Sequence, residues 1–231
     1  MNGTISESIA NFKPITVIDL NNNNFTGPMP ERISELSELK QLSLNNNQLY
    51  GTIPNSYSKL TKLTAINIGT NDIVGTLPAS LGLLNKLTLF AVNENYLDGT
   101  LPSTFSNLTL LQYFYLDFNG FYGEIPAYLG SFSSLQYLIM DENYFSGTIP
   151  ASIAAIPGLT NLYMHTNRLT GTIPPELGNM QSLTLIDVHG NHLIGSVPAE
   201  LGNLRNLAVL NLYTNYLTGT LPEALGNLTL I

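Results

Sequence analysis

A 24-residue repeat runs through the whole chain and constrains its fold more than any other feature of the sequence. Three residue types recur at this spacing nine times without an insertion. The glycine column runs from Gly27 to Gly219, and the proline column runs from Pro30 to Pro222. The asparagine column consists of Asn23, Asn47, Asn71, Asn95, Asn119, Asn143, Asn167, Asn191 and Asn215. Three invariant columns at one period indicate a stack of similar structural turns.

Apolar residues follow the same period and predict the elements of one turn. Leu42 and Leu44 alternate as in a short strand with one buried face. The later spacing of Ile53, Tyr57 and Leu60 suits a helical or 3-10 return segment. A single turn cannot bury its apolar face, so stacked turns share one continuous core, which predicts a solenoid.

The asparagine column is predicted to be an interior ladder with a structural role. A side-chain amide offers two donors and an acceptor, which can satisfy backbone groups where the chain leaves the strand. Asn46 directly precedes the ladder residue Asn47 and is expected to face solvent, so alanine there should cost little. The glycine column is expected to allow a positive φ, and the proline column to begin the return segment.

The turn LKQLSLNNNQLYGTIPNSYSKLTK, residues 39–62, resembles the plant-specific class of leucine-rich repeat, which the L-x-G-x-I-P half distinguishes. The resemblance implies an α/β solenoid: a right-handed superhelix with a parallel concave β-sheet and short helical or 3-10 return segments. We expect one domain over residues 1–231, with nine repeats and partial turns at both ends. Plant relatives have cysteine pairs in their capping segments, whereas this chain has no cysteine. It therefore resembles a fragment of a longer array or a cysteine-free lineage.

Composition excludes several classes of function. The chain has 16 acidic and 8 basic residues and a formal charge of −8. Nucleic-acid binders and polybasic membrane-surface modules need a basic face, so both classes are excluded. No apolar run reaches the roughly 18 residues of a membrane span, and no signal peptide is visible. No cofactor is expected.

The variable columns of the predicted concave face change character after the fourth turn. Early turns present small and amide side chains, whereas turns five to eight collect aromatic residues with acidic and histidine neighbours. Exposed aromatic residues are typical of binding hot spots, although strand surfaces also favour tyrosine and isoleucine. The candidate binding residues are Tyr113, Tyr115, Asp117, Phe118, Tyr137, Ile139, Asp141, Glu142, Tyr163, His165, Asp187 and His189.

Asp141, His165 and His189 share one column in consecutive turns. Residues in a row do not surround an ion, so we expect no metal site. Histidine titrates near pH 6.5, which favours a pH-sensitive binding surface instead. We expect no enzymatic activity, because Asp187 and His189 have no hydroxyl or thiol nucleophile in a shared pocket and an open sheet lacks a water-excluding cleft.

The leading hypothesis is a protein-interaction module of receptor-ectodomain type that binds a peptide or protein on its concave face. The acidic residues Asp117, Asp141 and Glu142 indicate a partner of basic character. The resemblance implies an extracellular or cell-surface location. One alternative is a secreted inhibitor of a polysaccharide-degrading enzyme. Another is an ice-binding or structural solenoid, because a threonine column, interrupted by Pro28 and Glu124, follows the glycines at Thr52, Thr76, Thr100, Thr148, Thr172 and Thr220.

Overall fold

The structure is a computed structural model that describes residues 2–228 and 230. The chain divides into two compact units, Met1–Phe121 and Tyr122–Ile231, which we call the first and second unit. Each unit is a stack of turns, and each turn contributes two short strands and one 3-10 helix. The predicted solenoid of parallel strands with 3-10 return segments is confirmed.

The first strand of each turn carries the alternating apolar residues. These first strands are β2 (Val17–Asp19), β4 (Gln41–Ser43), β6 (Ala65–Asn67), β8 (Leu89–Ala91) and β10 (Tyr113–Tyr115) in the first unit, and β12 (Tyr137–Ile139), β14 (Asn161–Tyr163), β16 (Leu185–Asp187) and β18 (Val209–Asn211) in the second. Within each unit they pair in parallel with a register of one repeat, as in Ile18 opposite Leu42. The middle residue of each strand therefore points into the core, and the outer two form a solvent-facing surface.

The second strand of each turn contains its column glycine or ends just before it, and these strands pair in parallel apart from the first strands. These strands are β1 (Asn2–Thr4), β3 (Asn24–Pro28), β5 (Gln48–Gly51), β7 (Asp72–Thr76), β9 (Tyr96–Gly99), β11 (Gly120–Glu124), β13 (Tyr144–Thr148), β15 (Arg168–Thr170), β17 (Ile194–Gly195) and β19 (Tyr216–Leu217). The column glycines from Gly27 to Gly219 all have positive φ, as the sequence predicted.

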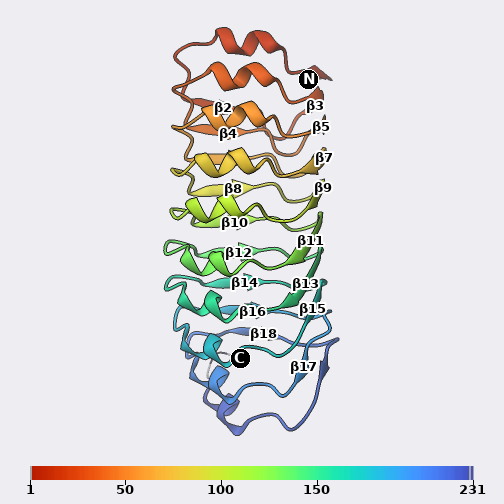
Figure 1. Ribbon diagram of the computed structural model, residues 1–231, viewed down its shortest axis with the longest axis vertical. Helices are drawn as coiled ribbons and strands as arrows, with labels where there is room; N and C mark the ends of the chain where they lie inside the picture. Colours follow the sequence, from red (N-terminus) through yellow and green to blue (C-terminus); the bar gives the residue numbers. More distant parts are fainter. Residues whose placement is uncertain (1, 229, 231) are drawn as a thin grey trace. The chain divides into compact units, whose positions relative to one another are not determined.

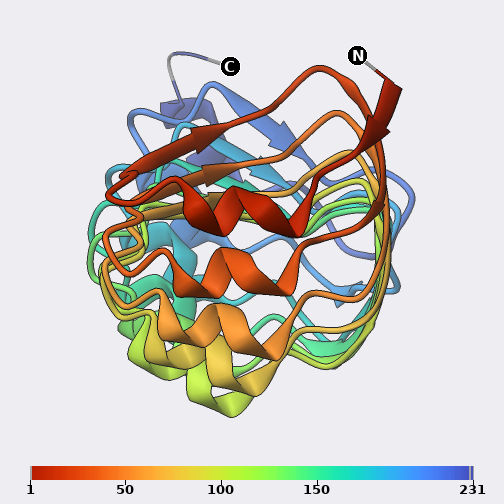
Figure 2. The same ribbon diagram turned by 90° about the horizontal axis from the view of Figure 1, so that it is seen from above.

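The return segments are 3-10 helices, each of five residues. They are η1 (Glu7–Asn11), η2 (Glu31–Glu35), η3 (Asn55–Lys59), η4 (Ala79–Leu83), η5 (Ser103–Asn107), η6 (Ala127–Ser131), η7 (Ala151–Ala155), η8 (Pro175–Asn179), η9 (Ala199–Asn203) and η10 (Glu223–Asn227). From η2 onward, a column proline in extended conformation directly precedes the helix, where its missing N–H costs nothing. In the first unit the helices lie across the interior from the first strands (Figure 1, Figure 2). No helix in the described part of the chain is long and apolar enough to cross a membrane.

The core is a column of aliphatic and aromatic side chains repeated in every turn. Leu42, Leu44, Leu49 and Leu60 are fully buried in one turn. Tyr57 is also fully buried, and its hydroxyl donates a hydrogen bond of 3.0 Å to the Pro30 carbonyl oxygen. The polar end of this tyrosine is therefore satisfied inside the stack.

The asparagine ladder holds the turns together through a repeated set of hydrogen bonds. In the second unit, Asn167 Nδ2 lies 3.0 to 3.2 Å from the carbonyl oxygens of Met140, Met164 and His165. Its Oδ1 accepts a hydrogen bond of 2.9 Å from the backbone N–H of Phe145. Two of these four partners belong to the preceding turn. The ladder amides therefore satisfy backbone groups that the core would otherwise leave unpaired.

The residue before each ladder asparagine adopts a left-handed backbone, which the sequence analysis did not predict. Its φ is 50° to 63° in the eight residues from Asn46 to Thr214, and 54° in Asn22. Only one position in this left-handed column is glycine; the others are Asn22, Asn46, Thr70, Glu94, Phe118, Glu142, Thr166 and Thr214. Asparagine tolerates this conformation, whereas other side chains pay about 1–2 kcal/mol. Asn46 is exposed, as the sequence predicted, but its left-handed backbone leads us to expect a larger cost for alanine there than the sequence suggested.

Candidate binding surface

Of the predicted apolar binding residues, all but Phe118 lie on the outer face of the first strands. In the first unit, the rings of Tyr113 and Tyr115 on β10 meet edge to face, with centroids 6.2 Å apart. In the second unit, Tyr137 and Ile139 lie on β12, and Ile139 is opposite Tyr163 of β14. All five side chains are half-buried rather than fully exposed, since neighbouring side chains on the face cover part of each one. They form a partly covered apolar face on each unit.

Three rings form a continuous stack at the ends of successive first strands in the second unit. The rings of His165 and His189 are 4.4 Å apart and nearly parallel. The ring of Tyr213 lies 4.1 Å beyond His189 in the same orientation. The one-repeat register places these residues in a row, so the stack is a direct product of the 24-residue period. Tyr213 was not among the binding residues predicted from the sequence.

Each histidine of the stack contacts a buried carboxylate. His189 Nδ1 lies 2.6 Å from Asp187 Oδ1, and His165 Nε2 lies 3.3 Å from Asp141 Oδ2. Asn211 Nδ2 donates a further hydrogen bond of 2.8 Å to Asp187 Oδ2. Asp141 and Asp187 are only 5% and 6% exposed. These two carboxylates therefore lie beneath the face and hold the imidazoles, and are not the freely exposed charges that the sequence suggested.

Burial also changes the titration of one of these groups. It raises the pKa of the Asp141 carboxyl above its ordinary value of 3.8, and the nearby His165 opposes this rise in pKa. On its other side, His165 Nδ1 lies 3.2 Å from Thr166 Oγ1. No cluster of three or more possible metal ligands was found among the described residues. The arrangement is therefore a set of oriented rings over paired acids.

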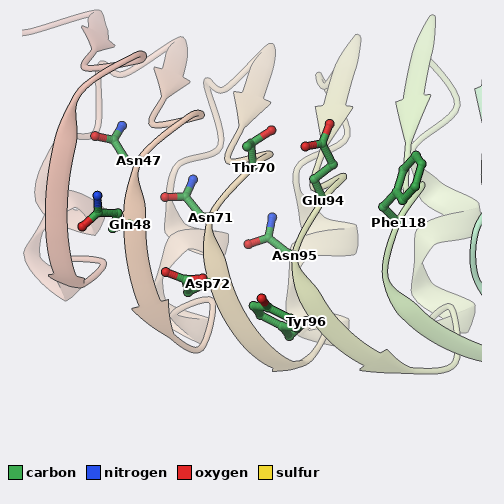
Figure 3. Close-up of a pocket in the computed structure, with 9 residues that line it drawn as sticks. All are labelled: Asn47, Gln48, Thr70, Asn71, Asp72, Glu94, Asn95, Tyr96 and Phe118. Carbon is green, nitrogen blue, oxygen red and sulfur yellow. The ribbon is translucent and has the colours of Figure 1, made fainter.

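A second feature of the surface is an open groove of about 400 Å³ in the first unit (Figure 3). Its lining comes from four successive turns, at the place in each where the chain passes from the first strand to the second. Of the predicted site residues it includes Phe118. Its ladder asparagines were predicted only as structural residues, and its remaining wall residues were not predicted, because they share no side-chain type along their columns. The groove is lined by Asn47, Gln48, Thr70, Asn71, Asp72, Glu94, Asn95, Tyr96 and Phe118.

Two sequence models of the leucine-rich repeat match the chain. One matches residues 13–73, and the other matches residues 134–156, 158–180, 182–204 and 206–228, so that together they cover more than half of the chain. The chain belongs to the leucine-rich repeat family. A search of curated protein sequences found no match to this leucine-rich repeat chain.

Solved structures similar to this leucine-rich repeat chain include plant receptors. A TDR receptor is 33% identical with a TM-score of 0.96, and the alignment covers 98% of this chain and 39% of the receptor chain. The Arabidopsis receptor kinase HAESA, solved with the peptide hormone IDA and a co-receptor, is 31% identical with a TM-score of 0.96 over 99% of this chain and 38% of that one. A plant ice-binding protein is 26% identical with a TM-score of 0.83 over 96% of this chain and 71% of that one. This chain thus spans less than half the length of the receptor chains, and the plant-type resemblance is confirmed.

Proposed function

We propose that this leucine-rich repeat chain is a protein-interaction module that binds a peptide or protein through the outer face of its first strands. The observation that carries the proposal is the row of partly covered aromatic and aliphatic side chains on that face, in a fold shared with receptors solved in complex with peptide hormones. Similarity to those receptors also favours an extracellular or cell-surface location.

The second unit offers the most ordered part of this face. Tyr137, Ile139 and Tyr163 present apolar surface whose strands are fixed by buried leucines, and the His165 and His189 rings border it. Rigid aromatic side chains bind with a small loss of conformational entropy, which is why hot spots favour them. Because Asp141 and Asp187 are buried against histidines, we base any preference for a basic partner on Glu142.

The test is a screen of a peptide library against the immobilised chain, followed by affinity measurements on variants. Tyr137→Ser with Tyr163→Ser should weaken binding of a selected peptide by about 30-fold or more, the size expected for a hot spot. Tyr122→Ser is the matched control, because Tyr122 is an exposed tyrosine of the second strands. Equal affinity of the double variant and the wild type would refute a role for the first-strand face.

A second candidate function is ice binding, which the similar plant ice-binding protein favours. The side chains of Thr52, Thr76 and Thr100 are exposed at the ends of successive second strands of the first unit: Thr76 is the last residue of β7, and Thr52 and Thr100 directly follow β5 and β9. The Thr76 methyl group lies over Gly99, so the column glycines leave room for an even row of threonines. Wild-type protein that slows ice recrystallisation, with the activity lost in Thr76→Lys with Thr100→Lys, would support this function. No effect of the wild type on ice growth would exclude it.

A further inference from the structure

The groove of the first unit has a floor and two walls made from three adjacent columns of the repeat. Figure 3 shows Thr70, Glu94 and Phe118 along one wall and Gln48, Asp72 and Tyr96 along the other. The ladder residues Asn47, Asn71 and Asn95 lie between the two walls. Each wall is one column, so the groove follows the direction in which the turns stack.

The amide donors of the floor are fully used within the protein, and each amide oxygen already accepts one backbone hydrogen bond. Asn71 Nδ2 donates to three carbonyl oxygens at 3.1 Å, and its Oδ1 accepts from the Leu49 N–H at 3.0 Å. Asn95 is used in the same way. The floor can therefore donate no further hydrogen bond to a ligand, and the charged and aromatic groups of the groove all belong to the walls.

The two walls carry carboxylates that the described residues do not neutralise. Glu94 on one wall and Asp72 on the other are both exposed, and no ion pair to either is found in the described part of the chain. The lysine and arginine ion pairs of the first unit involve Glu35 and Glu38, which lie outside the groove. A ligand between the walls would meet negative charge from both sides.

The same walls expose two aromatic rings. Tyr96 is 67% exposed and Phe118 is 50% exposed. Phe118 also occupies the left-handed column with a φ of 51°, where asparagine serves at Asn22 and Asn46. A large ring at this position is costly for the fold and adds apolar surface to the groove. The groove thus combines two carboxylates with two accessible π faces.

We propose that this groove binds an arginine side chain of an extended peptide. A guanidinium group is planar, donates five hydrogen bonds and stacks on aromatic rings, so it can meet Glu94, Asp72 and a ring together. An ammonium group has no planar face to stack and is more strongly hydrated. The groove lies on the loops between the two strands of each turn of the first unit, and its lining includes neither Tyr137 nor Tyr163. This proposal therefore goes beyond the proposed function and does not depend on it.

The probe is the peptide acetyl-Gly-Arg-Gly-Arg-Gly-amide, titrated into the whole chain at low salt by nuclear magnetic resonance and calorimetry. Its citrulline analogue keeps the shape and loses the charge, and it should bind at least about tenfold more weakly. The tyrosine ring signals of Tyr96 should shift with the arginine peptide. Equal binding of both peptides, or shifts confined to signals outside the groove, would overturn the proposal.

Charge-removing variants distinguish binding in the groove from attraction by the net negative charge of the protein. Glu94→Gln with Asp72→Asn should weaken the probe by about tenfold or more. Asp98→Asn removes an exposed carboxylate from β9, outside the groove, and should leave the affinity within about twofold. An equal loss in the Asp98 variant would show that only net charge matters and would overturn the assignment.

Phe118→Asn tests the ring without endangering the fold, because asparagine suits the left-handed backbone of this column. The variant should fold as well as the wild type and bind the probe about threefold or more weakly. Unchanged affinity would show that the Phe118 ring does not contribute to binding of the arginine probe and would overturn that part of the assignment. The Tyr137 and Tyr163 double variant should keep full probe affinity, so failure of the groove and failure of the first-strand face give different results.

Discussion

At the scale of single residues, the ladder asparagines make the most concentrated hydrogen bonding in the molecule. Asn167→Ala removes four hydrogen bonds from a buried site and leaves several backbone groups unpaired. We expect the free energy of unfolding to fall by about 2–3 kcal/mol in a urea titration. Asn179→Ala, at an exposed position of η8, should change it by less than about 0.5 kcal/mol. Similar losses in both variants would contradict an interior role for the ladder.

In the left-handed column, we expect substitutions at two equivalent positions to change stability in opposite directions. Asn46→Ala places a less suitable residue at a φ of 56° and should reduce stability by about 1 kcal/mol. Thr70→Asn places a more suitable residue at a φ of 53° and should increase stability by several tenths of a kcal/mol. Both changes are measurable by chemical denaturation, and the same sign for both would contradict the backbone explanation.

The solenoid, the ladder, the positive-φ glycines and the prolines before the return segments could all be predicted, because each depends on an invariant column. The left-handed column could not, because its residues share a backbone conformation but not a residue type: Thr70, Glu94 and Phe118 have no common side-chain property. For the same reason the groove was missed. The burial of Asp141 could not be predicted either, since it depends on the side chains of adjoining turns that cover the carboxylate.

At the scale of elements, the packing of neighbouring 3-10 helices depends on one glycine column. A Cβ atom on Gly178 of η8 would collide with the backbone carbonyl oxygen of Glu200 in η9, whereas a Cβ atom on Gly226 of η10 would meet no atom within 4 Å. Gly178→Ala should therefore cost more than about 2 kcal/mol, since backbone must move. Gly226→Ala should be neutral or slightly stabilising. Thermal and urea unfolding check this contrast, and equal effects would refute it.

The burial of the Asp141 carboxyl gives stability a pH dependence, which the nearby His165 reduces. Because the pKa of Asp141 is raised, the folded protein holds this proton more tightly than the unfolded chain does. Raising the pH from about 4 through the folded pKa therefore reduces the contribution of this group to stability. Asp141→Asn cannot titrate and should lack that part of the slope. The test is to measure the unfolding free energies of the wild type and Asp141→Asn from about pH 3.5 to 6. The difference between the two values should change with pH, and parallel curves would contradict the prediction.

At the scale of the whole molecule, stability is organised turn by turn. The principal backbone contacts of each described strand and helix are with its counterparts in adjoining turns. Solenoids of this kind behave as chains of nearest-neighbour interactions. Gly178→Ala should therefore accelerate amide hydrogen exchange mainly in residues 161–228, while exchange in residues 17–67 stays near the wild-type rate. Mass spectrometry of peptic fragments measures this directly, and uniform acceleration along the chain would show global cooperativity instead.

The ladder also has a direction, and this bears on how the protein is made. Within each unit a ladder asparagine reaches back to the preceding turn, as Asn71 does to the Leu44 carbonyl and the Leu49 N–H. A turn therefore lacks the amide that completes its interior until the next 24 residues have left the ribosome. At about 5–20 residues per second, that interval is roughly one to five seconds. The most recently synthesised turn is thus always incomplete during translation, and it is the part of the nascent chain on which chaperones would act.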